Sequence, residues 1–407
     1  MQEMKDLWLV AIGAGTWQSH GIEVARAQGI RVLALDGDPA APGLRAADLS
    51  YLVDIRDENA VIEAVRLSGI KASGAISLCS EAGMNAAAAV REAFDLAGPR
   101  ADLTYALTNK ARQRALWRHA SVPGPHWHVA ENLPEARRWL KEIGFPAIVK
   151  PVDSAGSRGV TKVESESEIE PAILAAFEHS LSKKVIVESI LAGTEYTVET
   201  FSQGGVTHVL AVTGKKKVTG TRGTVAIELA TPDLPTHLIT LLGDTAVAAL
   251  TALGHIDGPG HSELITNDDG CIGVVETAGR GGGFMLFEGL VPWASGFDVT
   301  VACVRQAVGL PVEPVRLQSK AVVLRFFPCR PGTVRDIQGF DEVTRWPNVR
   351  AAPFVRVGEK VGLAKTDGDR MGYLLTRGDT IAEAQTLAAR VEAQISFRIE
   401  ATDGTES

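Results

Sequence analysis

Short apolar runs alternate with helical patterns over the first hundred residues, and this alternation limits the possible folds more than any other feature of the sequence. Three of these runs read as strands: Leu7–Ile12, Ile30–Asp36 and Gly74–Leu78. The stretches that follow them space apolar residues as helices do, and they are 18–28, 57–67 and 84–96. Strands that alternate with helices form a parallel sheet covered by helices. We therefore predict an α/β domain over residues 1–99.

The rest of the chain divides at about residue 312. Up to there, helical patterns at 109–119, 134–143, 168–181, 238–253 and 297–308 mix with apolar runs at 147–150, 184–189, 195–201, 206–212, 261–265 and 271–277. Beyond it, short strands at 320–327, 354–357 and 372–377 precede a closing helix, Thr380–Ile395, which we expect Asp379 to cap. This predicts a second domain over 100–311 and a small α+β domain over 312–407.

Composition excludes several classes of protein. Of the 407 residues 45% are hydrophobic, which rules out a disordered chain, and 41 basic against 49 acidic residues give a formal charge of −8. An acidic chain does not coat nucleic acid or anionic membranes. No stretch approaches the roughly 20 apolar residues of a membrane span, and the four cysteines lie far apart. The first apolar run reads as a strand rather than a signal peptide, so we expect a cytoplasmic protein. Because nucleic acid and membranes are excluded as main partners, we expect it to act on small molecules.

A dinucleotide site is the first function that the motifs suggest. Gly13-Ala14-Gly15 follows a strand, and Asp36 ends the next strand about 20 residues later, as in the GxGxxG fingerprint. However, Gln18 stands where the last glycine should allow close packing against the pyrophosphate. We interpret the segment as a tight strand-to-helix turn in a Rossmann-like domain. An NAD-dependent oxidoreductase stays as an alternative.

A phosphate-binding site is the second function that the motifs suggest. Lys150 ends an apolar strand, and the loop after it holds Gly156 and Gly159, so that a cation and unhindered backbone N–H groups can converge on a polyphosphate. No GxxxxGK[ST] motif occurs. The alternative is a surface turn beside a lysine.

Two acids occur in neighbouring strands at positions that half-buried strands usually fill with apolar residues, Glu263 and Glu276. An even-numbered hairpin loop would pair Glu263 with Val274 and His261 with Glu276, and the two carboxylates would be diagonal neighbours at about 7 Å. A slip of one residue would separate them. Carboxylate oxygens suit Mg²⁺ or Mn²⁺. With Arg280 nearby, the set predicts phosphoryl transfer from a nucleotide, and the alternative is an exposed hairpin.

These residues resemble the ATP-grasp superfamily of carboxylate–amine ligases over nearly the whole chain. The resemblance rests on Thr108-Asn109-Lys110 with Arg114, on 145–151 followed by 156–160, on Val187-Glu188-Ser189, on 193–199, and on Glu263 with Glu276-Thr277-Ala278-Gly279-Arg280. It implies an α/β and α+β chain with the ATP-grasp fold: a Rossmann-like domain over 1–99, an ATP-grasp domain over 100–311 with a mobile lid at about 122–190, and a small α+β domain over 312–407. It also implies ATP and Mg²⁺ or Mn²⁺ as cofactors.

Within the superfamily the chain most resembles the L-amino acid ligases, through His261-Ser262-Glu263, 280–283 and 369–373. Such enzymes activate a carboxylate as an acyl phosphate and join it to an amine, releasing ADP and phosphate. The resemblance implies these roles: Lys110, Lys150, Ser157, Gly159, Glu188 and Glu195 bind the nucleotide; Glu263 and Glu276 bind the metal; Arg280 and His261 are catalytic; Glu81 and Phe284 bind substrate. Glu81 has an alternative role as a helix N-terminal acid.

Several points stay open at this level. Ala278 replaces an Asn common in the motif ExNxR, which predicts altered metal coordination. Lys215–Lys217 with Arg222 form either a loop that closes over phosphates or a solvated surface loop. A biotin-carboxylase-like or purine-pathway enzyme that uses bicarbonate is the nearest alternative, and a non-catalytic ATP-binding regulator is another. A homodimer is an expectation from the resemblance.

Overall fold

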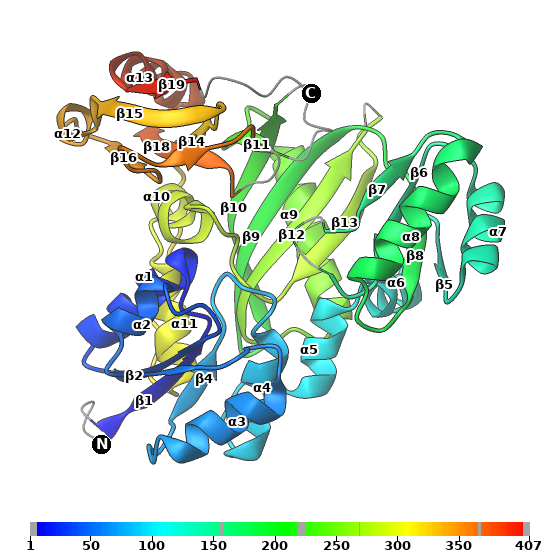
Figure 1. The fold of residues 1–407 in the computed structure, drawn as a ribbon, viewed down its shortest axis with the longest axis horizontal. Helices are drawn as coiled ribbons and strands as arrows, with labels where there is room; N and C mark the ends of the chain where they lie inside the picture. Colours follow the sequence, from blue (N-terminus) through cyan, green and yellow to red (C-terminus); the bar gives the residue numbers. More distant parts are fainter. Residues whose placement is uncertain are drawn as a thin grey trace. The chain divides into compact units, whose positions relative to one another are not determined.

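A computed structural model describes residues 6–154, 156, 158–218, 225–267, 269–364 and 368–401. The chain forms two compact units (Figure 1). The first unit contains Met1–Val209, His237–Gly283 and Asp298–Pro314, and the second contains Leu210–Thr236, Phe284–Phe297 and Val315–Ser407. The chain therefore passes between the units five times. The three predicted domain ranges stay a prediction.

The N-terminal part of the first unit is the predicted α/β domain. Its parallel sheet has the order β3-β2-β1-β4, formed by Leu49–Leu52, Arg31–Asp36, Trp8–Ile12 and Gly74–Ile76. Five helices follow along the chain: α1 (Thr16–Ala27), α2 (Pro42–Ala46), α3 (Glu58–Leu67), α4 (Met84–Ala93) and α5 (Ala101–Thr108). The α/β prediction is confirmed. Strand β3 was not predicted; it has only four residues, and all four are exposed.

The turn after β1 has a structural explanation that needs no dinucleotide. Asp36 accepts hydrogen bonds from the backbone N–H groups of Ala14 (2.7 Å) and Asp38 (2.9 Å). The Gln18 side chain donates to the Cys79 carbonyl at 3.1 Å. The acid that a dinucleotide would need for its ribose is thus already used to hold the turn, as the interpretation of this segment expects.

A four-stranded antiparallel sheet places the predicted phosphate-binding lysine. Its order is β5-β8-β6-β7, formed by Trp127–Ala130, Val185–Ser189, Ala147–Pro151 and Thr161–Val163. Helices α7 (Leu133–Ile143) and α8 (Ile169–His179) pack against it around a core that includes Leu140 and Ile173, and η2 (Glu166–Glu168) precedes α8. Ile148 pairs with Glu188 and Lys150 with Ile186, so Lys150 and Glu188 are diagonal neighbours on one face.

Three further antiparallel strands of the first unit carry the acids: β13 (Ile272–Ala278), β12 (Gly258–Thr266) and β9 (Thr194–Gln203). Helices α6 (Lys110–His119), α9 (Thr236–Ala252) and α11 (Val299–Ala307) complete this part. The predicted hairpin register is wrong. Thr266 pairs with Ile272, the register shifts after Leu264 pairs with Val274, and Glu263 then pairs with Glu276 while His261 pairs with Ala278. There are two causes: residues 267–271 between the paired ends number five instead of the even number assumed, and a β-bulge at Val275 shifts the register by one more residue.

The second unit holds the C-terminal strands. In one sheet, β10 (Val206–Lys217), which begins in the first unit, is followed in order by β11 (Ala226–Ala230), β14 (Ala321–Pro328), β18 (Arg370–Gly378) and β16 (Val349–Pro353). A small sheet has the order β17 (Lys360–Val361), β15 (Gly332–Gln338) and β19 (Ser396–Glu400). The helices are η3 (Leu286–Leu290), α10 (Val291–Ser295), α12 (Phe340–Val343) and α13 (Ile381–Gln394).

Three local predictions in this unit are wrong. The strand expected at 354–357 lies at Val349–Pro353 instead. Thr380 rather than Asp379 caps α13, through a capping box with Glu383, and Asp379 pairs with Lys320 at 2.5 Å. Lys215–Lys217 lie on β10 paired with β11 rather than in a loop, and Lys216 contacts Glu228 at 2.6 Å. Arg222 lies outside the described residues. Among the helices that the structure describes, none has the length and apolar character to span a membrane.

Candidate functional site

Two lysines and a buried carboxylate form the part of the candidate site that was predicted to bind phosphate, in the first unit. Asn109 caps α6, so Lys110 begins that helix, and its ammonium contacts the Ser154 carbonyl and the Glu276 carboxylate, both at 2.7 Å. Lys150 on β6 contacts Glu188 at 2.7 Å. The structure thus joins the predicted lysines to predicted acids. Each cation is held by a carboxylate at its tip, and these contacts fix where the two ammonium groups lie.

Glu188, which the resemblance assigns to nucleotide binding, also pairs with two buried cations. It is 3% exposed, and besides Lys150 it accepts from Arg114 Nε at 2.8 Å and Nη2 at 3.2 Å. Burial by itself would raise the pKa of this carboxyl, but Lys150 and Arg114 outweigh it and lower the pKa. Glu188 is therefore a permanent anion that balances two buried cations.

The glycine loop lies between β6 and β7. Gly156 and Gly159 both have a positive φ, +66° and +72°. A Cβ on Gly159 would come within 2.9 Å of Pro151 and 3.0 Å of His179, so only glycine fits there. Gly159 is thus required by packing within the protein, whereas a Cβ on Gly156 would meet nothing within 4 Å. Ser157, predicted to bind the nucleotide, lies outside the described residues.

One face of β9, β12 and β13 carries the acids. On β12, His261 lies opposite Glu199 of β9, and Glu263 lies opposite Glu276 of β13. Glu195, predicted to bind the nucleotide, lies opposite Ile265 on the same face, because side chains alternate along a strand. Burial raises the pKa of Glu276, but Lys110 and Lys150 outweigh it, so its pKa is lowered. The two predicted metal ligands are direct cross-strand neighbours rather than diagonal ones.

Glu199 is a residue of the candidate site to which the sequence reasoning gave no role. Its carboxylate binds His261 Nδ1 and accepts from the backbone N–H of Gly282 at 3.2 Å, and His261 Nε2 lies 3.7 Å from Glu263. Burial disfavours a charged His261, but Glu199 outweighs it and raises the pKa of His261 to about 9. The alternation Glu195, Thr197, Glu199 on an otherwise buried strand was the signal that could have found it.

Arg280 lies beside an acid from the α/β domain. Its guanidinium is 3.6 Å from the Glu81 carboxylate, which is held between β4 and α4 and largely buried. Burial raises the pKa of Glu81, against the lowering effect of Lys110. Glu81 thus faces Arg280, which is more than its alternative role as a helix N-terminal acid requires. A cation and an anion side by side match the carboxylate and ammonium of an α-amino acid.

Two predicted positions remain. Ala278 is buried opposite His261, so the motif has no side-chain oxygen at that position. Phe284 belongs to the second unit and has a left-handed backbone with φ of +54°, as does Met285 at +64°. Non-glycine residues take this conformation at some cost, and they concentrate at functional sites.

The donor set fits a nucleotide-bound magnesium ion. No group of three or more His, Cys, Asp or Glu side chains with metal-site geometry occurs among the described residues. Glu263 on β12 and Glu276 on β13 supply carboxylate oxygens from two neighbouring strands, on one face. Mg²⁺ is usually held by one or two carboxylates, water and substrate phosphates rather than by a full protein cage. Two carboxylates near two lysines therefore suit Mg²⁺ with a polyphosphate, and a structural zinc site is excluded for this group.

The chain matches two family models. A model of the ATP-grasp domain matches residues 143–288, and a model of the L-amino acid ligase C-terminal domain 2 matches residues 325–400. The chain contains an ATP-grasp domain. The predicted superfamily and fold class are thus confirmed, and the matched range of the first model holds Lys150, Glu188, Glu263, Glu276 and Arg280.

Solved structures and relatives agree with this ATP-grasp fold. An L-amino acid ligase from Bacillus licheniformis is similar with a TM-score of 0.84 at 21% identity, covering 97% of this chain and 99% of that one. A phosphoribosylglycinamide synthetase from Anaerococcus prevotii reaches 0.78 at 19% identity, covering 97% and 100%. A formate-dependent phosphoribosylglycinamide formyltransferase from Sulfurisphaera tokodaii is 24% identical over 96% of both chains. An uncharacterized protein from Sinorhizobium fredii is 26% identical over 93% of this chain and 80% of its own length.

Proposed function

We propose that this ATP-grasp protein is an ATP-dependent carboxylate–amine ligase that activates an α-amino acid. The observation that carries the proposal is the cross-strand pair Glu263 and Glu276, with Lys110 on one of its carboxylates and Glu199 and His261 on the same face. The adjacent Glu81 and Arg280 favour an amino acid over bicarbonate, because bicarbonate has no ammonium group for Glu81 to bind.

The proposed reaction has two steps. A carboxylate oxygen of the first substrate attacks the γ-phosphorus of ATP, the bond to the ADP oxygen breaks, and an acyl phosphate forms. The amine nitrogen of the second substrate then attacks the acyl carbon and loses a proton, and phosphate leaves. Positioning and charge stabilisation supply most of the rate in phosphoryl transfer.

Each residue has a proposed part. Lys110 and Lys150 hold the phosphates, with the loop of Gly156, Ser157 and Gly159, while Glu188 and Glu195 hold the rest of the nucleotide. Arg280 binds the substrate carboxylate, Glu81 its ammonium, and His261, held by Glu199, lies next to the reacting groups. We assign Phe284 to the first amino acid's pocket, as the resemblance implies. Mg²⁺ held by Glu263 and Glu276 would neutralise phosphate charge.

ATP turnover with a substrate panel tests the proposal. Purified protein with ATP and Mg²⁺ is offered amino acids singly and in pairs, then bicarbonate and formate, with ADP measured and products identified by mass spectrometry. We expect ADP and a dipeptide or related amide with amino acids. Glu276→Ala should abolish turnover, whereas Glu170→Ala, at an exposed ion pair with Arg137, should not. ADP formation that needs bicarbonate or formate but no amino acid would overturn the amino acid assignment. Nucleotide binding without turnover on any substrate would favour a regulator instead.

We also propose that the protein works in the cytoplasm as a homodimer on small molecules. All four of its cysteines are free, which suits a reducing compartment. Size-exclusion chromatography with light scattering measures the oligomeric state.

A further inference from the structure

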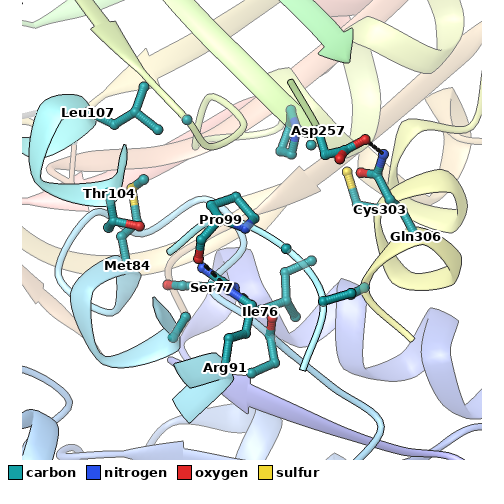
Figure 2. A pocket seen from close by; sticks show the side chains of 18 residues that line it. Ile76, Ser77, Met84, Arg91, Pro99, Thr104, Leu107, Asp257, Cys303 and Gln306 are labelled. Atoms are coloured by element: carbon teal, nitrogen blue, oxygen red, sulfur yellow. Dashed lines mark hydrogen bonds between the residues drawn. The ribbon is translucent and has the colours of Figure 1, made fainter. Parts of the chain in front are cut away.

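A cavity of about 80 Å³ lies within the first unit (Figure 2), and neither Glu263 nor Glu276 is among its lining residues. Its walls come from β4, α4, α5, α11 and the start of β12. Enclosed water needs about 10–15 Å³ of such space per molecule, so the cavity has room for about five to eight non-hydrogen atoms. This is the size of a small metabolite rather than of a nucleotide.

A buried cation forms one end of the cavity. Arg91, on the last turn of α4, is 7% exposed. Its Nε donates to the Pro99 carbonyl at 2.7 Å, the contact that Figure 2 shows, and its Nη1 donates to the Ala75 carbonyl at 2.8 Å. It makes no ion pair with any residue that the structure describes. Burial lowers the pKa of Arg91 to about 10, so the guanidinium keeps its charge at neutral pH.

A hydroxyl without a partner lies on the same cavity. Thr104 of α5 is 1% exposed, and its Oγ1 makes no hydrogen bond to any of the described residues. A threonine within a helix usually satisfies its hydroxyl on the preceding turn. A buried hydroxyl left unpaired costs free energy that a ligand can recover. Thr104 and Arg91 together therefore offer hydrogen-bond donors beside a positive charge.

The remaining walls are apolar or already satisfied. Ile76, Met84, Leu107 and Cys303 line the cavity with carbon and sulfur. The acid in the wall, Asp257, accepts from Gly204 N at 2.8 Å and from Gln306 Nε2 at 3.0 Å, so its charge is engaged. The chemistry that fits is one carboxylate on a short apolar body.

We propose that this cavity is a second binding site, separate from the ligase site, for a short-chain monocarboxylate whose carboxylate lies between Arg91 and Thr104. The unpaired hydroxyl and the uncompensated buried cation gain partners, and the alkyl chain contacts the apolar wall. Gly279, next to Arg280, is also part of the lining, so occupancy would be adjacent to a residue of the ligase site. The proposal does not depend on the identity of the ligase substrates.

Binding to the full-length protein without nucleotide tests it. Butyrate, butan-1-ol and butylamine are titrated at constant ionic strength by isothermal calorimetry, with melting temperature as a second readout. We expect saturable binding of butyrate only. Thr104→Val, which keeps the volume, should weaken butyrate about tenfold, because a hydrogen bond to a charged group is lost. Arg91→Gln should weaken it more, and Thr104→Val keeps the test decisive if Arg91→Gln does not fold.

Arg280→Met separates the two sites, since a carboxylate could instead bind at the ligase site. We expect butyrate to bind this variant within twofold of the wild-type affinity. Loss of binding in Arg280→Met, equal binding of butan-1-ol, or unchanged butyrate affinity in Thr104→Val would each overturn the proposal. Failure of the ligase assay would leave this binding result unaffected, so the two proposals can fail separately.

Discussion

Replacing Glu188 by Gln is the perturbation whose cost the structure specifies most directly. The amide keeps the shape of the side chain and removes the charge, which leaves Arg114 and Lys150 buried with their common anion gone. Removing one partner of a buried ion pair costs about 3–5 kcal/mol, because the remaining charge stays desolvated. A protein of ordinary stability has a free energy of unfolding of about 5–15 kcal/mol, so the variant should lose a large share of its stability.

Glu170→Gln is the matched control. Glu170 contacts Arg137 at 3.0 Å, but both side chains are about half exposed, and such pairs contribute about 0–1 kcal/mol. Urea unfolding of the wild type and both variants gives the difference in free energy, with an unchanged slope against urea as the criterion that the same surface is exposed. We expect Glu188→Gln to lower the free energy of unfolding at least three times as much as Glu170→Gln.

A second substitution tests the cause. Lys150→Met in the Glu188→Gln background removes one of the uncompensated cations, so it should restore part of the lost stability although it also removes a native residue. If Glu188→Gln costs no more than Glu170→Gln, or if Lys150→Met lowers the stability of Glu188→Gln further, the charge balance that we assign to Glu188 is refuted.

Two further predictions use other buried carboxylates. Glu199→Gln should lower kcat about 10–100-fold while the KM for ATP changes little, because the Glu199 carboxylate orients His261. Steady-state ADP formation measures both constants, and an equal rise in the KM for ATP would contradict a positioning role. Glu228 is held by two cations that outweigh burial and lower its pKa, so it stabilises the fold above its unfolded pKa of about 4.5 and this contribution disappears as the pH falls through the lower folded value. Melting temperatures from pH 7 to pH 3 should therefore fall less steeply for Glu228→Gln than for the wild type, and parallel curves would contradict this.

Sequence patterns predicted the features that follow from local chemistry. The parallel sheet follows from apolar runs between helical patterns, and Lys110 begins its helix because Asn109 is a good cap. The cap of α13 could not be settled in this way. Asp379 and Thr380 are both good capping residues, and Asp379 instead pairs with Lys320, 59 positions away in the chain. A contact so distant in the sequence leaves no local pattern.

The sequence also could not predict roles that depend on which residues of two strands lie opposite each other. Glu199 gains its role only because β9 pairs with β12 in the register that places it opposite His261. Lys215–Lys217 looked like a loop because charged residues are rare in strands, but β11 provides a partner for Lys216 in Glu228. In both cases an ionic contact between strands explains a charge that local patterns interpret as exposed.

The bulge at Val275 has a functional consequence that can be measured. Continued from Leu264 opposite Val274 without a bulge, the ladder would place Glu263 opposite Val275, and Glu276 would lie on the other face. The extra residue instead brings the two carboxylates directly opposite, with Cβ atoms about 4.5–5.5 Å apart. At that spacing both can reach one Mg²⁺ ion, whose bonds to oxygen are about 2.0–2.1 Å long.

One shared ion predicts non-additive losses. With Mn²⁺ as a paramagnetic substitute and a non-hydrolysable ATP analogue, Glu263→Gln and Glu276→Gln should each weaken metal binding by at least about tenfold. The double variant should lose little more than the worse single variant, because residues that share one ligand do not act independently. Glu170→Gln should bind as the wild type does. If the two losses instead multiply, the carboxylates serve separate ions, and the direct opposition created by the bulge is not what binds the metal.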